Sequence, residues 1–372
     1  MKRSTFVILC LEGAVLSFNV AAAAALVPAI AQDFVLSQFF VSKIIWLYMI
    51  PYGMAALFYG PLVRAIDARK VELVCMFFFS GANLLAALAR NIYLLFAARF
   101  LMGLFGASVI PLGLILIARH IPQASRGGFV GVFFGATFVA SLLGLVLSGI
   151  IHWRLIFLLP ALCGFILATF IYFLLPSFRA DKTAFKLNYF AAFRIKAVIS
   201  LFTYIFFISL IYHGLQQWLP VYFSTHFNYK QLVISALITL TSLSGILGEV
   251  IGGRLADRIG RIRTVDLGII LMSLCAFSLI FKTALIALVL IMVVWGLGWT
   301  FNHAGLSTML TDLPQEFLHE AASLNSGVRF LAGGLGVVLG GLLMQKSFSF
   351  GFLIFGSTLV LLLMISQKLL VR

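Results

Sequence analysis

The chain has 372 residues, of which 63% are hydrophobic and only 10% are charged, and its formal net charge is +15. So few charges, together with a mean hydropathy of +1.14, exclude an ordinary soluble globular protein. The basic excess does not indicate a nucleic-acid-binding protein, because the lysines and arginines lie in short loops between apolar segments. We therefore expect a protein embedded in a lipid bilayer, with no nucleic acid among its partners.

Apolar segments long enough to cross about 30 Å of hydrocarbon as helices recur along the whole chain. In order they are 6–30, 40–63, 71–89, 92–117, 128–151, 155–175, 197–219, 231–255, 265–281, 283–308, 320–345 and 349–367. The first follows Met1-Lys2-Arg3 and resembles a secretory signal, but Glu12 and Asn19 interrupt it, so we interpret it as a retained helix. The sequence thus predicts an all-α membrane protein with twelve transmembrane helices.

The longest polar interruption, residues 176–196, separates six apolar segments from six more. We predict an N-terminal six-helix bundle over 1–175, a basic cytoplasmic linker over 176–196 and a C-terminal six-helix bundle over 197–372. An even number of spans places both termini on one side, and most of the 26 lysines and arginines fall in the loops of that side. By the positive-inside rule both termini are then cytoplasmic, in a cytoplasmic (inner) membrane.

A short basic turn, Gly253-Arg254-Leu255-Ala256-Asp257-Arg258-Ile259-Gly260-Arg261-Ile262-Arg263, separates the eighth and ninth segments. It matches G-x-x-x-D-[RK]-x-G-[RK]-x-[RK] and so resembles the loop signature of the major facilitator superfamily of transporters. The resemblance implies two pseudo-symmetric six-helix bundles, in which Asp257 caps a helix of the opposite bundle and the neighbouring arginines bridge nearby. The gating residues expected are Gly253, Asp257, Arg258, Gly260, Arg261 and Glu249. The alternative is that these charges only fix the topology.

Other segments resemble the drug:proton antiporter branch of that superfamily. They are Ala29–Phe34, Trp46–Gly60 and Ala321–Arg329. The fourth-span pattern Arg99-x-x-x-Gly103-x-x-x-Ala107 resembles the fourth-helix motif of the superfamily as a whole. In the fifth span Gly135 and Gly144 keep the first spacing of the branch motif G-x8-G-x3-G-P, but Ser148 and Gly149 replace its Gly-Pro. This resemblance implies export of a small organic molecule in exchange for protons.

Ionisable side chains inside a membrane span are costly, and they mark cavities or ion pairs. We find four well inside spans: Glu12, Arg99, Glu249 and Arg329. A Glu12 carboxyl balanced between desolvation and the nearby cation Arg99 could bind and release a proton as access alternates. We therefore predict that Glu12 and Arg99 are the proton-coupling residues; a static ion pair or a snorkelling carboxylate is the alternative.

Aromatic and polar side chains cluster in the seventh and tenth segments. Trp295, Trp299 and His303 recur at helical spacing, and such rings with a few polar groups suit amphipathic organic substrates, including cations. Asn19 shares a helix face with Glu12, and Asn325 lies one turn below Arg329. The predicted substrate-cavity residues are Asn19, His213, Gln216, Trp295, Trp299, His303, Asn325 and Arg329. The alternative for each residue is ordinary packing.

Several kinds of chemistry lack their motifs in this sequence. There is no G-x-x-x-x-G-K-[ST] loop for ATP, no HExxH and no nucleophile–base arrangement, so we expect no enzyme, no cofactor and energy from an ion gradient. The cysteines form no CxxC pair and are interpreted as small buried side chains, with no metal. We predict proton-coupled export of a small organic substrate by a monomer. Uptake by proton symport or facilitated diffusion is the first alternative, and a non-transporting receptor the second.

Overall fold

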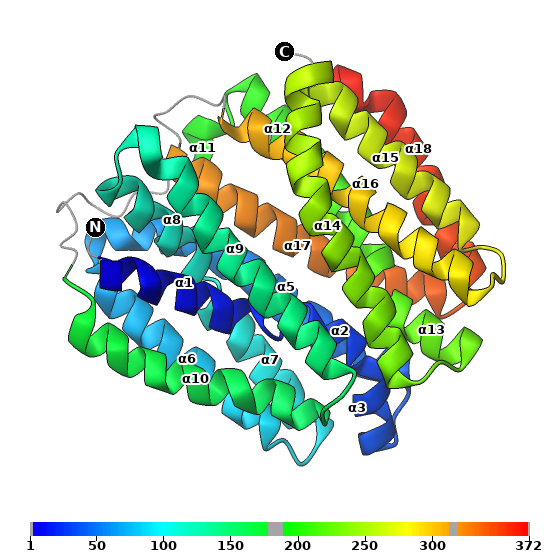
Figure 1. Ribbon diagram of the computed structural model, residues 1–372, viewed down its shortest axis with the longest axis horizontal. Coiled ribbons are helices and arrows are strands. Elements are labelled where there is room, and N and C mark those ends of the chain that lie inside the picture. The colour runs from blue at the N-terminus through cyan, green and yellow to red at the C-terminus, as the bar shows by residue number, and fades with distance from the viewer. Residues whose placement is uncertain (1–2, 178–188, 312–317, 371–372) are drawn as a thin grey trace. The chain divides into compact units, whose positions relative to one another are not determined.

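The computed structural model describes residues 3–177, 189–311 and 318–370, and within these ranges the chain is helical and contains no strand (Figure 1). The helices up to the 178–188 interval are α1 Arg3–Ser17, α2 Ala22–Ala25, α3 Val27–Phe34, α4 Gln38–Val41, α5 Lys43–Ala65, α6 Ala68–Ala87, α7 Ile92–Gly106, α8 Val109–His120, α9 Gln123–Ser148 and α10 Trp153–Leu174. Those after it are α11 Tyr189–Ala192, α12 Lys196–Gln216, α13 Leu219–Phe227, α14 Gln231–Ile259, α15 Arg261–Ser278, α16 Leu285–Thr311, α17 Leu318–Met344 and α18 Phe348–Leu370.

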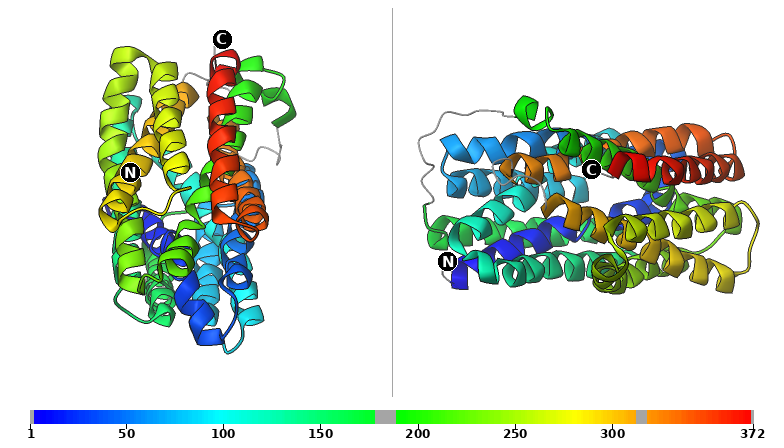
Figure 2. Two further views of the ribbon diagram at one scale, coloured as in Figure 1. Left: turned by 90° about the vertical axis from the view of Figure 1, so that its right-hand side faces the viewer. Right: turned by 90° about the horizontal axis from the view of Figure 1, so that it is seen from above.

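Eleven helices in the described ranges are long and apolar enough to cross a membrane. They match eleven of the twelve predicted segments. The segment predicted at 265–281 forms α15, which has 18 residues and carries Arg261, Arg263 and Asp266 in its first two turns. Its length of about 27 Å is slightly less than the hydrocarbon thickness. α15 nevertheless packs along α16 and α18, as a member of the same helix bundle (Figure 2).

Several spans are broken helices. α7 and α8 meet at Ala107 and Ser108, and Pro111 follows directly. Proline has no N–H for the carbonyl four residues earlier, which here is that of Ala107, so Pro111 removes one helical hydrogen bond at the break. Pro51, Pro61 and Pro160 lie inside continuous helices, so proline alone does not determine where a span is interrupted. α12 and α13 meet in the same way before Pro220. The first span is also interrupted, because α1 ends at Ser17.

Contacts divide the chain into two units. The first comprises Met1–Tyr189 with His319–Leu331, and in it α6 packs on α7 and α10, α5 on α7, and α1 on α9 and α10. The second comprises Phe190–Leu318 with Ala332–Arg372, and in it α14 and α15 both pack on α16, and α18 packs on α12 and α15.

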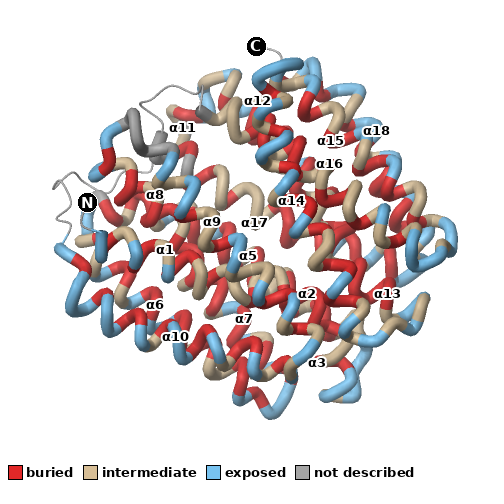
Figure 3. Tube along the Cα trace, in the orientation of Figure 1, coloured by how far each residue is buried: buried red, intermediate tan, exposed pale blue. Residues whose placement is uncertain are grey.

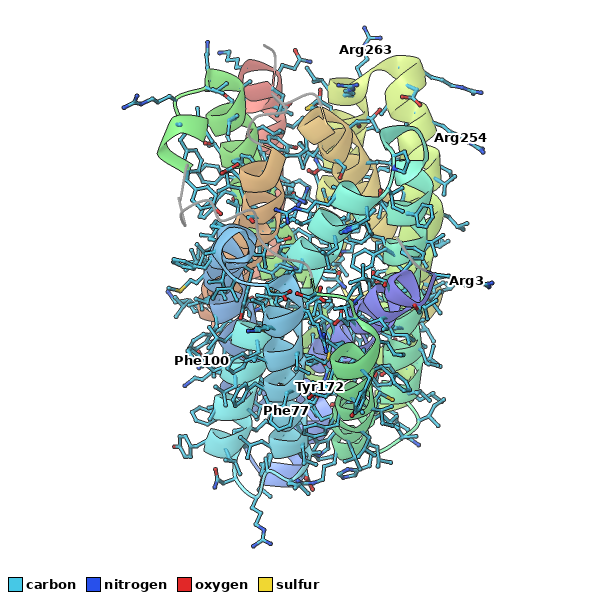
Figure 4. The ribbon with its side chains drawn as sticks, turned by 90° about the vertical axis from the view of Figure 1, so that its left-hand side faces the viewer. Arg3, Phe77, Phe100, Tyr172, Arg254 and Arg263 are labelled. Atoms are coloured by element: carbon cyan, nitrogen blue, oxygen red, sulfur yellow. The ribbon has the colours of Figure 1, made fainter. Side chains whose placement is uncertain are left out.

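The long helices have a buried face and an exposed face, whereas the short α2 is wholly buried (Figure 3). Many exposed side chains are large and apolar. Phe77, Phe100 and Tyr172, which point outward from α6, α7 and α10, are examples (Figure 4). Apolar side chains facing outward, with backbone hydrogen bonds closed inside each helix, are what a lipid environment requires. Arg254 and Arg263 point outward where α14 and α15 join (Figure 4).

Candidate functional site

A stack of aromatic rings lies in the second unit, between α12 and α16. The Tyr212 ring lies parallel to the Trp299 ring with centroids 3.7 Å apart, and it also lies parallel to Trp295 at 5.5 Å. The His213 and His303 rings lie 5.9 and 6.2 Å from Trp299. Tyr212, His213, Gln216, Glu249, Trp295, Trp299 and His303 are called the Trp299 cluster below. It unites all the predicted cavity residues of the seventh and tenth spans.

Hydrogen bonds fix the more deeply buried part of the Trp299 cluster. Trp295 is fully buried, and its Nε1–H donates to Gln216 Oε1 at 2.5 Å. The Gln216 amide in turn donates to the Thr241 hydroxyl at 3.5 Å, which connects α12 to α14. A buried indole N–H costs free energy unless it has such an acceptor, so this bond holds the ring in one orientation.

The more exposed part of the Trp299 cluster holds an acid–base pair. His303 Nδ1 on α16 lies 2.6 Å from Glu249 Oε1 on α14, and the two side chains are 31% and 29% exposed. The sequence predicts Glu249 among the gating residues; in the structure it contacts His303, and Asp257 lies more than two turns further along α14. The reason is helix register: α14 packs along α16 at this level.

The Trp299 cluster presents groups whose chemistry suits a flat polar molecule. Tyr212, His213 and Trp299 are only half-buried, so ring surface remains available beside the His303–Glu249 pair. Ring faces stack on heteroaromatic groups, a carboxylate accepts hydrogen bonds from hydroxyls or amines, and an imidazole can donate or accept. Tyr212, four residues before Gln216 on the same helix face, is one of the polar aromatic residues that the sequence places in the seventh span, and its ring contributes the stacking contact with Trp299.

The basic turn is tighter than the sequence suggested. α14 continues through Gly253 and Asp257 to Ile259, and α15 starts at Arg261, so Gly260 alone joins them. Its φ of 95° and ψ of 152° are accessible to glycine and to almost no other residue. Asp257 and Arg258 are exposed. A pocket of about 830 Å³ lies beside this joint, lined by Gly260, Arg261 and Arg263 and by the start of α12.

In the first unit Glu12 is buried in α1, with 1% exposure. Neither of its carboxyl oxygens has a hydrogen-bond partner within the described ranges. Asn19 is also buried, but it lies beyond the end of α1 and donates to Asn83 Oδ1 on α6 at 2.5 Å. The helical face that we expected Glu12 and Asn19 to share is thus interrupted, and Asn19 joins two helices.

The structure does not bring Arg99 to Glu12. Arg99 Nε donates to the Ile44 carbonyl at 2.9 Å, and its guanidinium lies 4.4 Å from the Tyr48 ring centroid and 6.0 Å from that of Phe157. Asn325 and Arg329 do form a pair, because Arg329 Nε donates to Asn325 Oδ1 at 2.8 Å. That pair belongs to the first unit, whereas the Trp299 cluster belongs to the second.

Glu72 on α6 is a buried acid that our sequence reasoning missed. It is 2% exposed, and its carboxyl group interacts electrostatically with that of Glu12. It lies at the start of the third predicted span, two residues after Lys70, and so it does not count among the ionisable residues well inside spans. The available signal was periodicity: Glu72, Cys75, Phe79 and Asn83 recur at helical spacing and are all buried.

Comparisons with known proteins agree with this architecture. The sequence profile of the Major Facilitator Superfamily matches residues 9–337. The purine ribonucleoside efflux pump NepI of Salmonella typhimurium is 24% identical over 328 residues, which cover 85% of this chain and 81% of the pump. NepI of Salmonella enteritidis is 24% identical over 325 residues, with the same coverage.

Solved structures resemble the whole chain. The nucleoside transporter NupG superimposes with a TM-score of 0.75 at 15% identity, covering 98% of this chain and 99% of NupG. The human organic anion transporter MFSD10 gives 0.76 at 15% identity, with coverage of 99% and 100%. A D-xylose-proton symporter gives 0.75 at 16% identity, with coverage of 98% and 97%. At these identities the likeness shows the fold. Since the profile spans nearly the whole sequence, this chain belongs to the Major Facilitator Superfamily and is a multi-pass membrane transporter of small molecules, not an enzyme.

Proposed function

We propose that this transporter exports purine ribonucleosides, or solutes of similar chemistry, in exchange for protons. The observation that carries the proposal is the Trp299 cluster, in which two half-buried rings adjoin an acid–base pair. Stacking of a nucleobase on an aromatic side chain contributes about 1–3 kcal/mol. Ribose hydroxyls are donors for the Glu249 carboxylate, and the His303 and His213 imidazoles can bond to the edge of a base.

The names of the relatives support export as the direction of transport. NepI of Salmonella is a purine ribonucleoside efflux pump by name, and it aligns over most of this chain. We expect this transporter to move solutes out of the cell. We also expect both termini and the basic joint between α14 and α15 to face the cytoplasm. We place the protein in the cytoplasmic membrane and expect a monomer to suffice, with each six-helix half forming one of two bundles that rock around the substrate.

The joint between α14 and α15 is the proposed cytoplasmic gate. Asp257 and Arg258 are exposed and so are available for contacts that hold this side closed. A carboxylate is stabilised near a helix N-terminus by about 0.3–1 kcal/mol. Breaking a few contacts of this size is compatible with a gate that must open repeatedly. Glu249 is reassigned from this gate to the substrate site.

The substrate site is tested by replacing Trp299 in purified protein reconstituted in liposomes, with inosine as the probe. Trp299→Ala removes the exposed stacking surface and is expected to reduce inosine exchange by about tenfold or more, whereas Trp299→Phe keeps a ring and retains most of it. The matched control is Trp46→Ala, because Trp46 is also half-buried but lies on α5 in the first unit. Equal rates for Trp299→Ala and Trp46→Ala would contradict the assignment.

A further inference from the structure

The first unit buries two carboxyl groups together. Glu12 on α1 and Glu72 on α6 are 1% and 2% exposed, and the two groups interact electrostatically. Among the residues that the structure describes, none forms a hydrogen bond to any of their four carboxyl oxygens. Buried carboxyl groups in folded proteins are ordinarily paired or hydrogen-bonded, so two interacting buried acids without such partners need an explanation.

The surroundings of this carboxyl pair are apolar. Leu9, one turn before Glu12, and Cys75, one turn after Glu72, belong to one buried hydrophobic cluster that also contains Val71, Leu112 and Phe133. In so weakly polarisable an environment two adjacent carboxylates repel strongly, because little solvent screens their charges.

The titratable groups around the pair include no counter-charge within the described ranges. Those that interact electrostatically with the pair are the Cys75 thiol and Asp67, a third acid, at the N-terminus of α6. The Cys75 thiol donates to the Tyr59 hydroxyl at 3.4 Å. On α8, His120 bonds to the Leu116 carbonyl. The described side chains of α9, residues 128–148, include no titratable group.

The two arginines of α7 and α10 are engaged elsewhere. Arg99 bonds to the Ile44 carbonyl. Arg154 bonds to the carbonyls of Ala87 and Ala89 and pairs with Asp33 at 3.4 Å. The electrostatic partner found for Glu12 is Glu72 and that for Glu72 is Asp67, so the interactions found within the described ranges are with acids.

We propose that Glu12 and Glu72 form a single proton-binding site, in which a proton held between the two carboxyl groups keeps the pair from carrying two charges. One carboxylate oxygen takes up the proton from water on one side of the membrane and returns it to water on the other. Two carboxyl groups that share a site do not ionise together. The proposal rests on the proposed function in one respect, since it identifies this proton as the one exchanged for substrate. In this proposal Glu72, and not Arg99, is the partner of Glu12.

Proton binding can be tested without any substrate. The full-length protein in lipid nanodiscs is titrated with acid while the carbonyl band of protonated carboxylic acids is followed by infrared spectroscopy. We expect a buried-acid band in the wild type that Glu12→Gln and Glu72→Gln each change and that the double variant lacks. Asp33→Asn is the control, because Asp33 already has a cationic partner. A band and titration unchanged in Glu72→Gln, or displaced by sodium at constant pH, would overturn the proposal.

Coupling is tested in proteoliposomes with inosine. Residues that act as one unit show non-additive losses, so Glu12→Gln, Glu72→Gln and the double variant should each lose pH-gradient-driven transport by a similar factor of about tenfold or more. Exchange of inosine without a gradient should stay within about twofold, which separates lost coupling from lost folding. Glu72→Asp keeps a carboxyl group and should retain coupling.

Wild-type coupling in Glu72→Gln would overturn the proposed pairing of Glu12 with Glu72. Absence of inosine transport in every protein would refute the proposed function and leave the infrared result to decide.

Discussion

At the scale of single residues, the buried polar groups fall into two kinds. Asn19, Arg99 and Trp295 each have a protein acceptor, and they connect helices within one unit. The carboxyl oxygens of Glu12 and Glu72 have no hydrogen-bond partner within the described ranges. Groups of the first kind stabilise the fold, because an unmet donor costs about 1–3 kcal/mol. The second kind is unfavourable for stability, which is why we associate it with function.

Two glycines of α9 make a matched test of close packing. A Cβ at Gly144 would overlap the Phe18 carbonyl oxygen, whereas a Cβ at Gly135 would meet no atom within 4 Å. Gly144→Ala should therefore lower the thermal midpoint by several degrees, while Gly135→Ala should leave it equal or slightly higher, because alanine favours a helix by about 1 kcal/mol. Thermal unfolding followed by tryptophan fluorescence in detergent measures both. Similar midpoints for the two variants would show that the contact with Phe18 contributes nothing.

Residue spacing predicted part of the site and missed the rest for a physical reason. Trp295, Trp299 and His303 could be placed together from the sequence because they lie on one helix face. The contact between Glu249 and His303 depends on the register between α14 and α16, which no local pattern encodes. The pairing of Glu12 with Glu72 likewise joins two helices far apart in sequence. The proton-coupling, cavity and gating roles of all the predicted site residues stay predictions.

At the scale of elements, hydrophobic length located the spans but not their interruptions. Apolar runs predict where a helix crosses a membrane, because length and hydropathy are all that the bilayer selects. The breaks within α7–α8 and α12–α13 depend on Pro111 and Pro220. The continuation of α14 to Ile259 was not expected, because Arg254, Asp257 and Arg258 are typical of a loop although they are tolerated at the polar end of a helix.

The single-residue joint between α14 and α15 gives the second matched test. Gly260 has a positive φ and Gly253 lies within a helix, and a Cβ at either position would meet no atom within 4 Å. Gly260→Ala is therefore expected to cost about 1–3 kcal/mol through backbone strain alone, whereas Gly253→Ala should be neutral or stabilising. The measurement is chemical or thermal unfolding of both purified variants. A Gly260→Ala protein as stable as the wild type would show that the joint readily adopts another conformation. Transport lost in a stable Gly253→Ala protein would support the gating role.

At the scale of the whole molecule, the family and the fold agree with the chain's composition. Outward-facing phenylalanines and leucines, eleven helices of membrane length and the superfamily profile all identify a membrane transporter. Composition could predict this much because a bilayer leaves its signature in every span. It could not predict the substrate, which in our proposal depends on how a few side chains of α12, α14 and α16 meet.

The most direct test of the account is the direction of proton movement in proteoliposomes that contain the wild-type protein, inosine and a pH-sensitive dye in the lumen. When the outside is diluted so that inosine flows out, an exchanger must bring protons in. We therefore predict that the lumen becomes more acidic, that the change requires inosine, and that it is lost in the Glu12→Gln Glu72→Gln double variant. A lumen that becomes more alkaline as inosine leaves would identify a symporter, and inosine efflux with no pH change would identify a facilitator; either would contradict proton-coupled export.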